Sequence, residues 1–420
     1  MAWFFLARPR SRVRWAARIA LLLLAGGAAG WAQAQAPLTL PQAFERAWER
    51  RPEAQALPAR RQAGEAQRRA AQGWTPAPAA LEAAVQTDRF NRRQGAQEVE
   101  VGLAVPLWLP GERQRSLGLA EAQAQAVEAQ TDSQRWQLAH TLRAQWWQTL
   151  REREDAQAAH ERWQASQALA VDVARRVQAG DLSRADRHQA DAAVASAWAE
   201  HLKAQAQAIA SEQALRALLG VPSDEALPLS TAPEPEPTTA EAPPVHPVLA
   251  ALEAKAQAQR SAAALAQTQS REHPEVTLLH TRDRAARGEA RTGAVTLGLR
   301  WPLGGGERHR AVVAGALAEQ TEAEVLLARE RERLAAEQRS AQAALAAARA
   351  VLGAAAERAR LTAETRDFFD KSFRLGETDL PTRLRVAQEA SHAQRDLALA
   401  RIDLNLAIAQ ARQSLGLLPQ

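Results

Sequence analysis

Two similar phrases, about 200 residues apart, constrain the fold of this chain more than any other feature of its sequence. Residues 99–115 read VEVGLAVPLWLPGERQR, and residues 295–310 read VTLGLRWPLGGGERHR. In each phrase an alternating apolar segment, typical of a strand, passes through Pro and Gly into a charged segment that is typical of a helix start. The chain is therefore expected to make the same strand-to-helix transition twice.

The spacing of other landmarks extends this duplication to almost the whole chain. Four pairs of residues are separated by 195 or 196 positions: Pro52 and Pro247, Pro106 and Pro302, Gly180 and Gly376, and Gly220 and Gly416. Such a fixed separation predicts an internal repeat. We expect a first repeat over residues 35–220, a second over 247–420, and between them, at 221–246, a Pro-rich acidic linker that is not packed structure.

Each repeat predicts the same order of elements: a helix, a β-hairpin, a very long helix and a closing helix. The hairpins fall at residues 79–108 and 275–303, where apolar and polar residues alternate on both sides of a polar turn. The long helices fall at 112–178 and 307–373, and neither contains a Pro. The shorter helices are expected at 52–72, 183–219, 247–270 and 380–415.

The lengths of these helices decide between architectures. At about 1.5 Å per residue, the helix over 307–373 spans roughly 100 Å, which is too long for a compact domain of this size. The two shorter helices of the same repeat, 247–270 and 380–415, together reach about 90 Å. We therefore expect a mainly α fold, in which two shorter helices lie end to end beside each long one in an elongated antiparallel bundle.

The predicted strands have two chemically different faces. In the first hairpin Val99, Val101 and Val105 share one face, while Glu98 and Glu100 share the other. Strands of about 9 to 11 residues with one apolar and one polar face are typical of outer-membrane β-barrels. Four strands cannot close a barrel, since the smallest have about eight, and open edges are not tolerated in lipid. A membrane location therefore requires several chains, each contributing two hairpins.

The turns that join strand to helix are candidate positions at a membrane surface. Their residues are Pro106, Trp108 and Gly111 in the first repeat and Trp301, Pro302 and Gly306 in the second. Tryptophan is enriched where a membrane meets water, and this favours an interfacial position. A place in the protein core is an equally good interpretation of both Trp side chains.

The first 34 residues predict a signal peptide that is removed after Ala34. An arginine-rich start is followed by a short apolar run and by Ala32-Gln33-Ala34, which suits a signal peptidase. The five Arg of this segment account for the whole formal net charge of +5, so the mature chain has no basic excess to bind nucleic acid. The chain has no Cys, which excludes N-terminal lipidation and disulfides.

The order of elements, the opening LTLPQAFERAWERRPEAQA at 38–56 and the ALLG that ends the first repeat resemble the TolC-like outer-membrane factors. The stretch FRLGETDLPTRLRVAQEA at 373–390 is similar to the CzcC-like branch, which is associated with efflux of heavy-metal cations such as cobalt, zinc and cadmium. The resemblance implies a homotrimer with a twelve-stranded barrel and a periplasmic tunnel of long helices, with a thin equatorial belt at mid-tunnel built mainly from 221–246. It also implies a passive exit duct that works with a periplasmic adaptor and an inner-membrane pump of the RND type.

The Gly interruptions mark where each long helix turns back, so they are expected at the periplasmic tip. The resemblance implies that this tip both constricts the tunnel and docks the adaptor. The residues at the two turns are Gly180, Asp181, Arg184 and Asp186 in the first repeat and Gly376, Glu377, Thr378 and Asp379 in the second. In a trimer each carboxylate is present three times and could form a cation-attracting ring. For Asp186 and Asp379, capping of a helix N-terminus is an equally good interpretation.

The sequence contains no pattern that predicts an enzyme, a cofactor or a resident metal. Gly304–Gly306 lacks the GK[ST] of a phosphate loop, and the nine His include no close pair at metal-ligand spacing on one helix face. Two other functions remain open. One is an outer-membrane exit duct for drugs or for type I protein secretion, and the other, more distant, is a soluble periplasmic coiled-coil adaptor.

Overall fold

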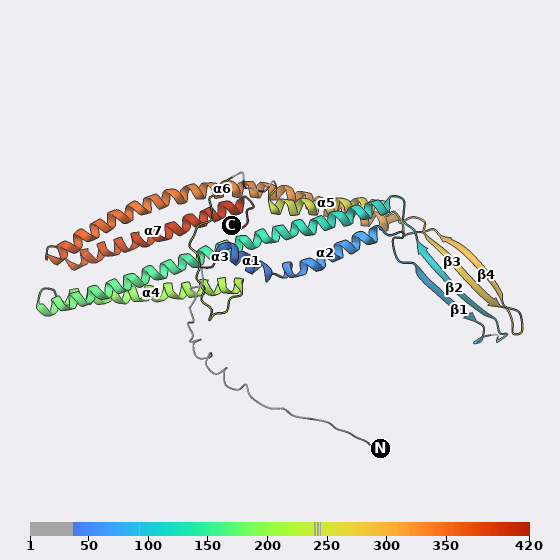
Figure 1. Cartoon of the computed structure of the whole chain (residues 1–420), viewed down its shortest axis with the longest axis horizontal. Coiled ribbons are helices and arrows are strands. Elements are labelled where there is room, and N and C mark those ends of the chain that lie inside the picture. The colour runs from blue at the N-terminus through green and yellow to red at the C-terminus, as the bar shows by residue number, and fades with distance from the viewer. Residues whose placement is uncertain (1–36, 92, 239–240, 242, 244) are drawn as a thin grey trace, which may run out of the picture. The chain divides into compact units, whose positions relative to one another are not determined.

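Two very long helices, one in each repeat, run through the unit formed by Leu38–Gln420 (Figure 1). Helix α3 spans Glu112–Ala179 and helix α6 spans Gly306–Arg374, with 68 and 69 residues. At the rise of an α-helix each is about 100 Å long. Both are free of Pro and rich in Ala, Gln, Glu and Arg, which are strong helix formers, so nothing in their interiors stops the helix.

The computed structural model describes residues 37–91, 93–238, 241, 243 and 245–420. The predicted signal peptide, residues 1–34, lies outside the described residues. The first repeat contains α1 (Leu40–Glu49), α2 (Pro52–Ala71), β1 (Ala80–Thr87), β2 (Gln97–Pro106), α3 and α4 (Arg184–Leu219). The second contains α5 (Pro247–Thr268), β3 (Glu275–Arg284), β4 (Thr292–Arg300), α6 and α7 (Leu380–Ser414). The predicted fold class, mainly helical with two antiparallel hairpins, is confirmed.

Each long helix packs against two shorter ones, as the lengths predicted. Helix α3 contacts α2 and α4, and α6 contacts α5 and α7. The two repeats join where α3 contacts α5 and α7. Figure 1 shows the sheet at one end of the helices and the α3–α4 and α6–α7 turns at the other. The strands and the Gly turns therefore lie at opposite ends of this unit.

The four strands form one antiparallel sheet in the order β1-β2-β3-β4. The two strands of each hairpin pair with each other, and the hairpins join through β2 and β3, where Val101 lies opposite His280. Strand β4 ends at Arg300, earlier than the predicted hairpin boundary at 303, because Arg300 lies opposite Glu275, the first residue of its partner β3. Strands β1 and β4 are the two edges of the sheet.

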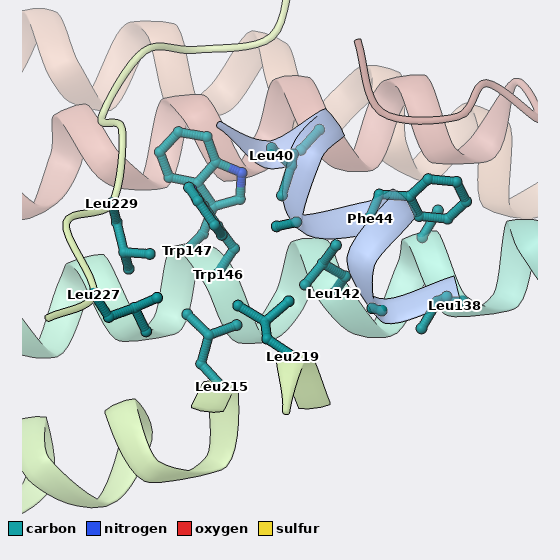
Figure 2. Packing of buried hydrophobic residues seen from close by; sticks show 14 of the residues in the cluster. Leu40, Phe44, Leu138, Leu142, Trp146, Trp147, Leu215, Leu219, Leu227 and Leu229 are labelled. Carbon is teal, nitrogen blue, oxygen red and sulfur yellow. The ribbon is translucent and has the colours of Figure 1, made fainter. Parts of the chain in front are cut away.

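The largest apolar core lies where α1 crosses α3 and the end of α4 (Figure 2). Phe44 from α1, Leu138, Trp146 and Trp147 from α3, and Leu215 from α4 are all at most 2% exposed. Apart from two small clusters, around Phe373 and around Trp136, many of the other buried residues of the helices are Ala, which lets the backbones approach closely but buries little apolar area. The aromatic and Leu-rich cluster therefore anchors the middle of the bundle.

The segment between the repeats is packed against this core, so the prediction of an unpacked linker is wrong. Leu227 and Leu229 are 7% and 9% exposed and belong to the core cluster. Leu38 forms a parallel bridge with Leu229, in which the N–H of Leu38 donates to the carbonyl of Pro228 at 2.7 Å. The Pro-rich composition forbids regular structure here, but the apolar residues between the prolines still find a buried surface.

A buried ionic network holds the same segment to both repeats. Arg143 of α3 donates two hydrogen bonds to Glu234, at 2.9 and 2.7 Å, and the two side chains are only 3% and 2% exposed. Arg412 of α7 approaches Glu234 at 3.5 Å and is fully buried. Because the carboxylate lies between one guanidinium from each repeat, it ties α3, α7 and the connecting segment together.

We expect Glu234→Gln to lower the free energy of unfolding by about 3 to 5 kcal/mol, because it leaves buried guanidinium charges without their counter-charge. Glu121→Gln is the matched control, since its ion pair with Arg68 is about half exposed and such pairs contribute about 1 kcal/mol or less. Thermal unfolding of the two purified variants in detergent measures the difference. Equal losses would show that the buried network does not stabilise the fold.

Candidate functional site

One face of the sheet is apolar and exposed. Leu81, Leu103, Leu278 and Leu297 lie opposite one another across all four strands, because antiparallel partners project to the same face. Their exposed fractions are 77%, 43%, 51% and 74%. Four Leu side chains in one row, none of them covered, form a surface that is costly to leave in water.

The apolar surface continues along the strands on both sides of this row, and on β3 it is interrupted by the exposed side chains of His280 and Arg282. Val85, Val101, Val295 and Leu299 share the same face and are also exposed, at 67%, 48%, 70% and 63%. The alternation that was read from the sequence thus produces an apolar face of the expected kind. A face of this size and composition suits contact with hydrocarbon or with a protein partner.

The opposite face of the sheet is polar and predominantly acidic. It carries Thr side chains and the carboxylates of Glu82, Glu98, Glu100, Glu275 and Asp283. Arg300 lies on this face as well, 3.4 Å from Glu275. The excess of carboxylates over basic groups on the four described strands gives this face a negative charge, which favours cations close to it.

The first strand-to-helix turn is tied to neighbouring segments by hydrogen bonds. Pro106 ends β2, and the indole N–H of Trp108 donates to the carbonyl of Gly73 at 3.1 Å. The Trp108 ring also lies edge-on to His273, with 6.3 Å between ring centroids. Gly111 adopts φ +77°, a left-handed conformation that favours Gly, immediately before α3. Trp108 is therefore half-buried within this joint.

The second turn is more open. Trp301 is 49% exposed, and the guanidinium carbon of Arg271 lies 5.8 Å from the centroid of its ring. Pro302 follows, and Gly306 begins α6 with φ +47°. The two repeats thus keep the same kind of joint but bury it to different extents.

Glu112 is the best-connected residue of the first joint, although in the sequence it looks only like the start of a helix. Its carboxylate is 1% exposed and accepts hydrogen bonds from the Leu109 N–H at 3.0 Å and from Gln269 at 2.7 Å. The imidazole of His273 lies 2.8 Å away. Burial raises the pKa of Glu112, but these hydrogen bonds outweigh it and hold the pKa below its ordinary value.

Glu112→Gln is expected to lower the free energy of unfolding by about 1 to 3 kcal/mol at neutral pH, because buried donors lose their charged acceptor. Because the pKa of Glu112 is lower in the folded chain than its ordinary value of 4.5, the ionised carboxylate stabilises the fold fully above pH 4.5. This stabilisation is lost as the pH falls from 4.5 through the pKa of the folded state. The difference from the parent chain should therefore shrink below pH 4.5. Thermal unfolding across pH 3 to 8 measures it, with Glu322→Gln, at an exposed position of α6, as the control. A difference that does not change with pH would contradict the assignment.

At the far end, both Gly residues occupy the turns where they were expected. Gly180 and Gly376 have φ +87° and +79°, so each ends its long helix in a left-handed conformation. The N–H of Asp181 donates back to the carbonyl of Arg176 at 2.9 Å, and that of Glu377 to Ser372 at 3.0 Å. Both long helices therefore end in the same local geometry.

The polar residues at these turns divide into caps and exposed groups. Asp186 accepts the Ser183 N–H at 2.9 Å in a capping box, and Asp379 accepts the Thr382 N–H at 3.1 Å. The hydrogen bonds to Thr382 hold the pKa of Asp379 below its ordinary value. Thr378 shares a hydrogen bond with Ser372, at 2.6 Å. The remaining side chains, those of Asp181, Arg184 and Glu377, are exposed.

The two turns are joined by residues that no sequence motif singled out. Phe373 is 2% exposed and packs with Val173 and Leu380. The guanidinium groups of Arg176 and Arg383 lie 4.9 and 4.7 Å from the centroid of its ring. Arg176 also donates to the carbonyl of Phe373 at 3.3 Å, which links α3 to the end of α6. The only feature of the sequence that could have indicated this contact is the position of the aromatic Phe373 three residues before Gly376.

Two features of the described residues bear on alternative functions. These residues contain no group of three or more His, Cys, Asp or Glu that could hold a metal ion. None of the helices in the described part of the chain combines the length and the apolar character that a membrane-crossing helix needs.

A long helical bundle that ends in a small two-faced sheet defines a class of fold, and comparison with known proteins identifies that class. Residues 43–221, essentially the first repeat, match the sequence model of the outer membrane efflux protein family. Comparison with curated protein sequences gives no significant match.

Solved structures share the fold over almost the whole chain. The outer membrane protein VceC from Vibrio cholerae has a TM-score of 0.73 at 18% identity, with 91% of this chain and 97% of VceC covered. The CmeC outer membrane channel from Campylobacter jejuni has 0.73 at 14%, covering 90% and 85%. The open state of the MtrE outer membrane channel from Neisseria gonorrhoeae has 0.72 at 16%, covering 90% and 89%. At 14% to 18% identity, these structures show the fold of the chain.

Proposed function

We propose that the chain is an outer-membrane efflux channel, the passive exit duct of a tripartite system with a periplasmic adaptor and an inner-membrane RND pump. The observation that carries the proposal is the exposed apolar face of the sheet, opposite an acidic face and at the end of helices about 100 Å long. Hydrocarbon covers the first face and water contacts the second. The helices then extend into the periplasm.

The match over residues 43–221 supports placing the whole chain in the outer membrane efflux protein family. The second repeat has the same order of elements as the first, at separations of 195 or 196 residues, so it belongs to the same family as the repeat that matches. A homotrimer follows, in which three chains with four strands each form a twelve-stranded barrel. A signal peptide at 1–34 would direct the chain to export.

Within this family we favour heavy-metal cations as the transported substrate. The stretch 373–390 resembles the CzcC-like branch, and the carboxylates on the polar sheet face suit the passage of cations through the barrel. The turns at Pro106, Trp108 and Gly111, and at Trp301, Pro302 and Gly306, lie at the membrane surface in this arrangement. Drugs or secreted proteins are the alternative cargo.

Deletion and fractionation test the proposal. The chain is expected in the outer-membrane fraction, as a trimer that dissociates to monomer when heated before electrophoresis. Its deletion should lower the concentration of cobalt, zinc or cadmium that stops growth, because the exit step is lost. A chain found in the soluble periplasmic fraction would favour the adaptor, and sensitivity to drugs alone would favour a drug duct.

The acidic residues at the tip are proposed to attract cations and to hold the closed state. Asp181→Asn together with Asp379→Asn removes these charges, while Asn retains the capping ability that Ala lacks. We expect greater sensitivity of cells to large antibiotics and a larger conductance in planar bilayers. Asp191→Asn, in α4 away from the turn, is the control. If only Asp379→Ala increases leakage, then capping and not charge is the role of that residue.

A further inference from the structure

The sheet has two unpaired edges, one on β1 and the other on β4. If the sheet lies in a membrane, as proposed above, both edges must be paired, since unpaired backbone groups are not tolerated in hydrocarbon. The internal repeat supplies the partner. Within the chain, β2 of the first repeat pairs with β3 of the second, and the equivalent pairing for the edges is β4 with β1.

The twelve-stranded barrel proposed above pairs β4 of one copy antiparallel with β1 of the next, and we propose the register of that pairing: Leu297 lies opposite Val85. The register follows from the pairing of Val101 with His280 inside the chain. Strand β4 repeats the phrase of β2 at a separation of 196 residues, and β3 begins 195 residues after β1. Val101 of β2 therefore corresponds to Leu297 of β4, 196 residues later, and His280 of β3 corresponds to Val85 of β1, 195 residues earlier. Since Val101 and His280 are paired inside the chain, Leu297 is placed opposite Val85.

This register matches the two faces of the sheet. Besides Leu297 and Val85, it sets Trp301 against Leu81, and these four residues, at 49% to 77% exposure, belong to the apolar face. A slip by one residue would place Leu297 opposite a residue of the polar face and reverse every later pair in the same way. The apolar pattern therefore excludes odd shifts of the register.

Charge distinguishes this register from shifts by two residues. On the polar face it sets Arg300 directly opposite Glu82, and opposite charges in directly opposed positions stabilise a strand pair. Arg300 is 72% exposed and already lies 3.4 Å from Glu275 of its own chain, so it would stand between two carboxylates. A shift by two residues places Arg300 opposite Ala80 or Ala84 and loses the second carboxylate.

The same correspondence extends from the strands into the joint. Inside the chain, the N–H of Leu107 donates to the carbonyl of Pro274 at 2.7 Å. The equivalent bond between copies runs from Leu303 to the carbonyl of Ala79. Leu303, which follows β4, and Trp74, which precedes β1, are 89% and 94% exposed, and a neighbouring copy covers each of them. The most exposed large apolar side chains of the joint therefore lie on the edges that the pairing closes.

Cysteine cross-linking tests the register, and the natural chain has no Cys to interfere. The matched pairs are Leu297→Cys with Val85→Cys and Thr296→Cys with Gln86→Cys. Neighbouring pairs of an antiparallel ladder alternate in spacing, so at least one of the two has the separation a disulfide requires. The control is Leu297→Cys with Ala83→Cys, shifted by two residues.

We expect oxidation of membranes to give reducible dimers and trimers for at least one matched pair, at about five times the yield of the shifted pair or more. An equal or greater yield from the shifted pair overturns the register. If the parent chain forms a trimer but neither matched pair cross-links, the register fails while the proposed function stands. If the parent chain forms no trimer, the proposed function itself fails.

A charge exchange provides a second measurement that needs no disulfide. Glu82→Arg and Arg300→Glu should each lower the temperature at which the trimer dissociates. The double exchange should restore part of the loss caused by Arg300→Glu alone, since the new carboxylate at position 300 regains one opposite charge but still faces Glu275. Glu98→Arg, on the same face, is the control for added charge, and its combination with Arg300→Glu should restore nothing. Restoration by both combinations, or by neither, would contradict a direct pairing of Glu82 with Arg300.

Discussion

The rest of the structure depends on one constraint, the pairing of backbone groups in a sheet that has too few strands to close. A single chain supplies four strands, one apolar face and two free edges, and each of these requires something outside the chain. The internal duplication supplies the missing strand partners, because the β2–β3 pairing that joins the two repeats within a chain can be repeated between β4 and β1 of neighbouring copies. The long helices then follow the strands, since each strand that leaves the sheet continues directly into α3 or α6.

The elements could be predicted from the sequence because their signals are local. The alternation of apolar and polar residues predicted the hairpins, and the Ala-rich runs without Pro predicted the long helices. Gly180 and Gly376 predicted the ends of the long helices to within a residue or two. Asp186 and Asp379 show the limit of such reasoning at the site. Their capping roles follow from neighbours three residues away, whereas any part in closing a channel depends on contacts between copies.

The contacts that the sequence could not reveal join segments far apart in the chain. Glu112 looks like an ordinary first residue of a helix, and its partners Gln269 and His273 belong to the other repeat. The Pro-rich segment at 221–246 was misread for a similar reason. Its composition excludes helix and strand correctly, but whether a loop packs depends on the surface that it meets, here the one around Leu229 and Glu234.

That packed segment also determines where the helices can bend. Glu234 fixes α3 at Arg143 and α7 at Arg412, about midway along the bundle. From Arg143 to the turn at Gly180 the helix continues for about 55 Å, so a tilt of about 10° at the fixed point moves the turn by about 10 Å. The half of the bundle beyond the ionic network can thus tilt about Glu234. The contacts of Phe373 with Arg176 and Arg383 hold the two turns together at the far end, where a given tilt produces the largest displacement.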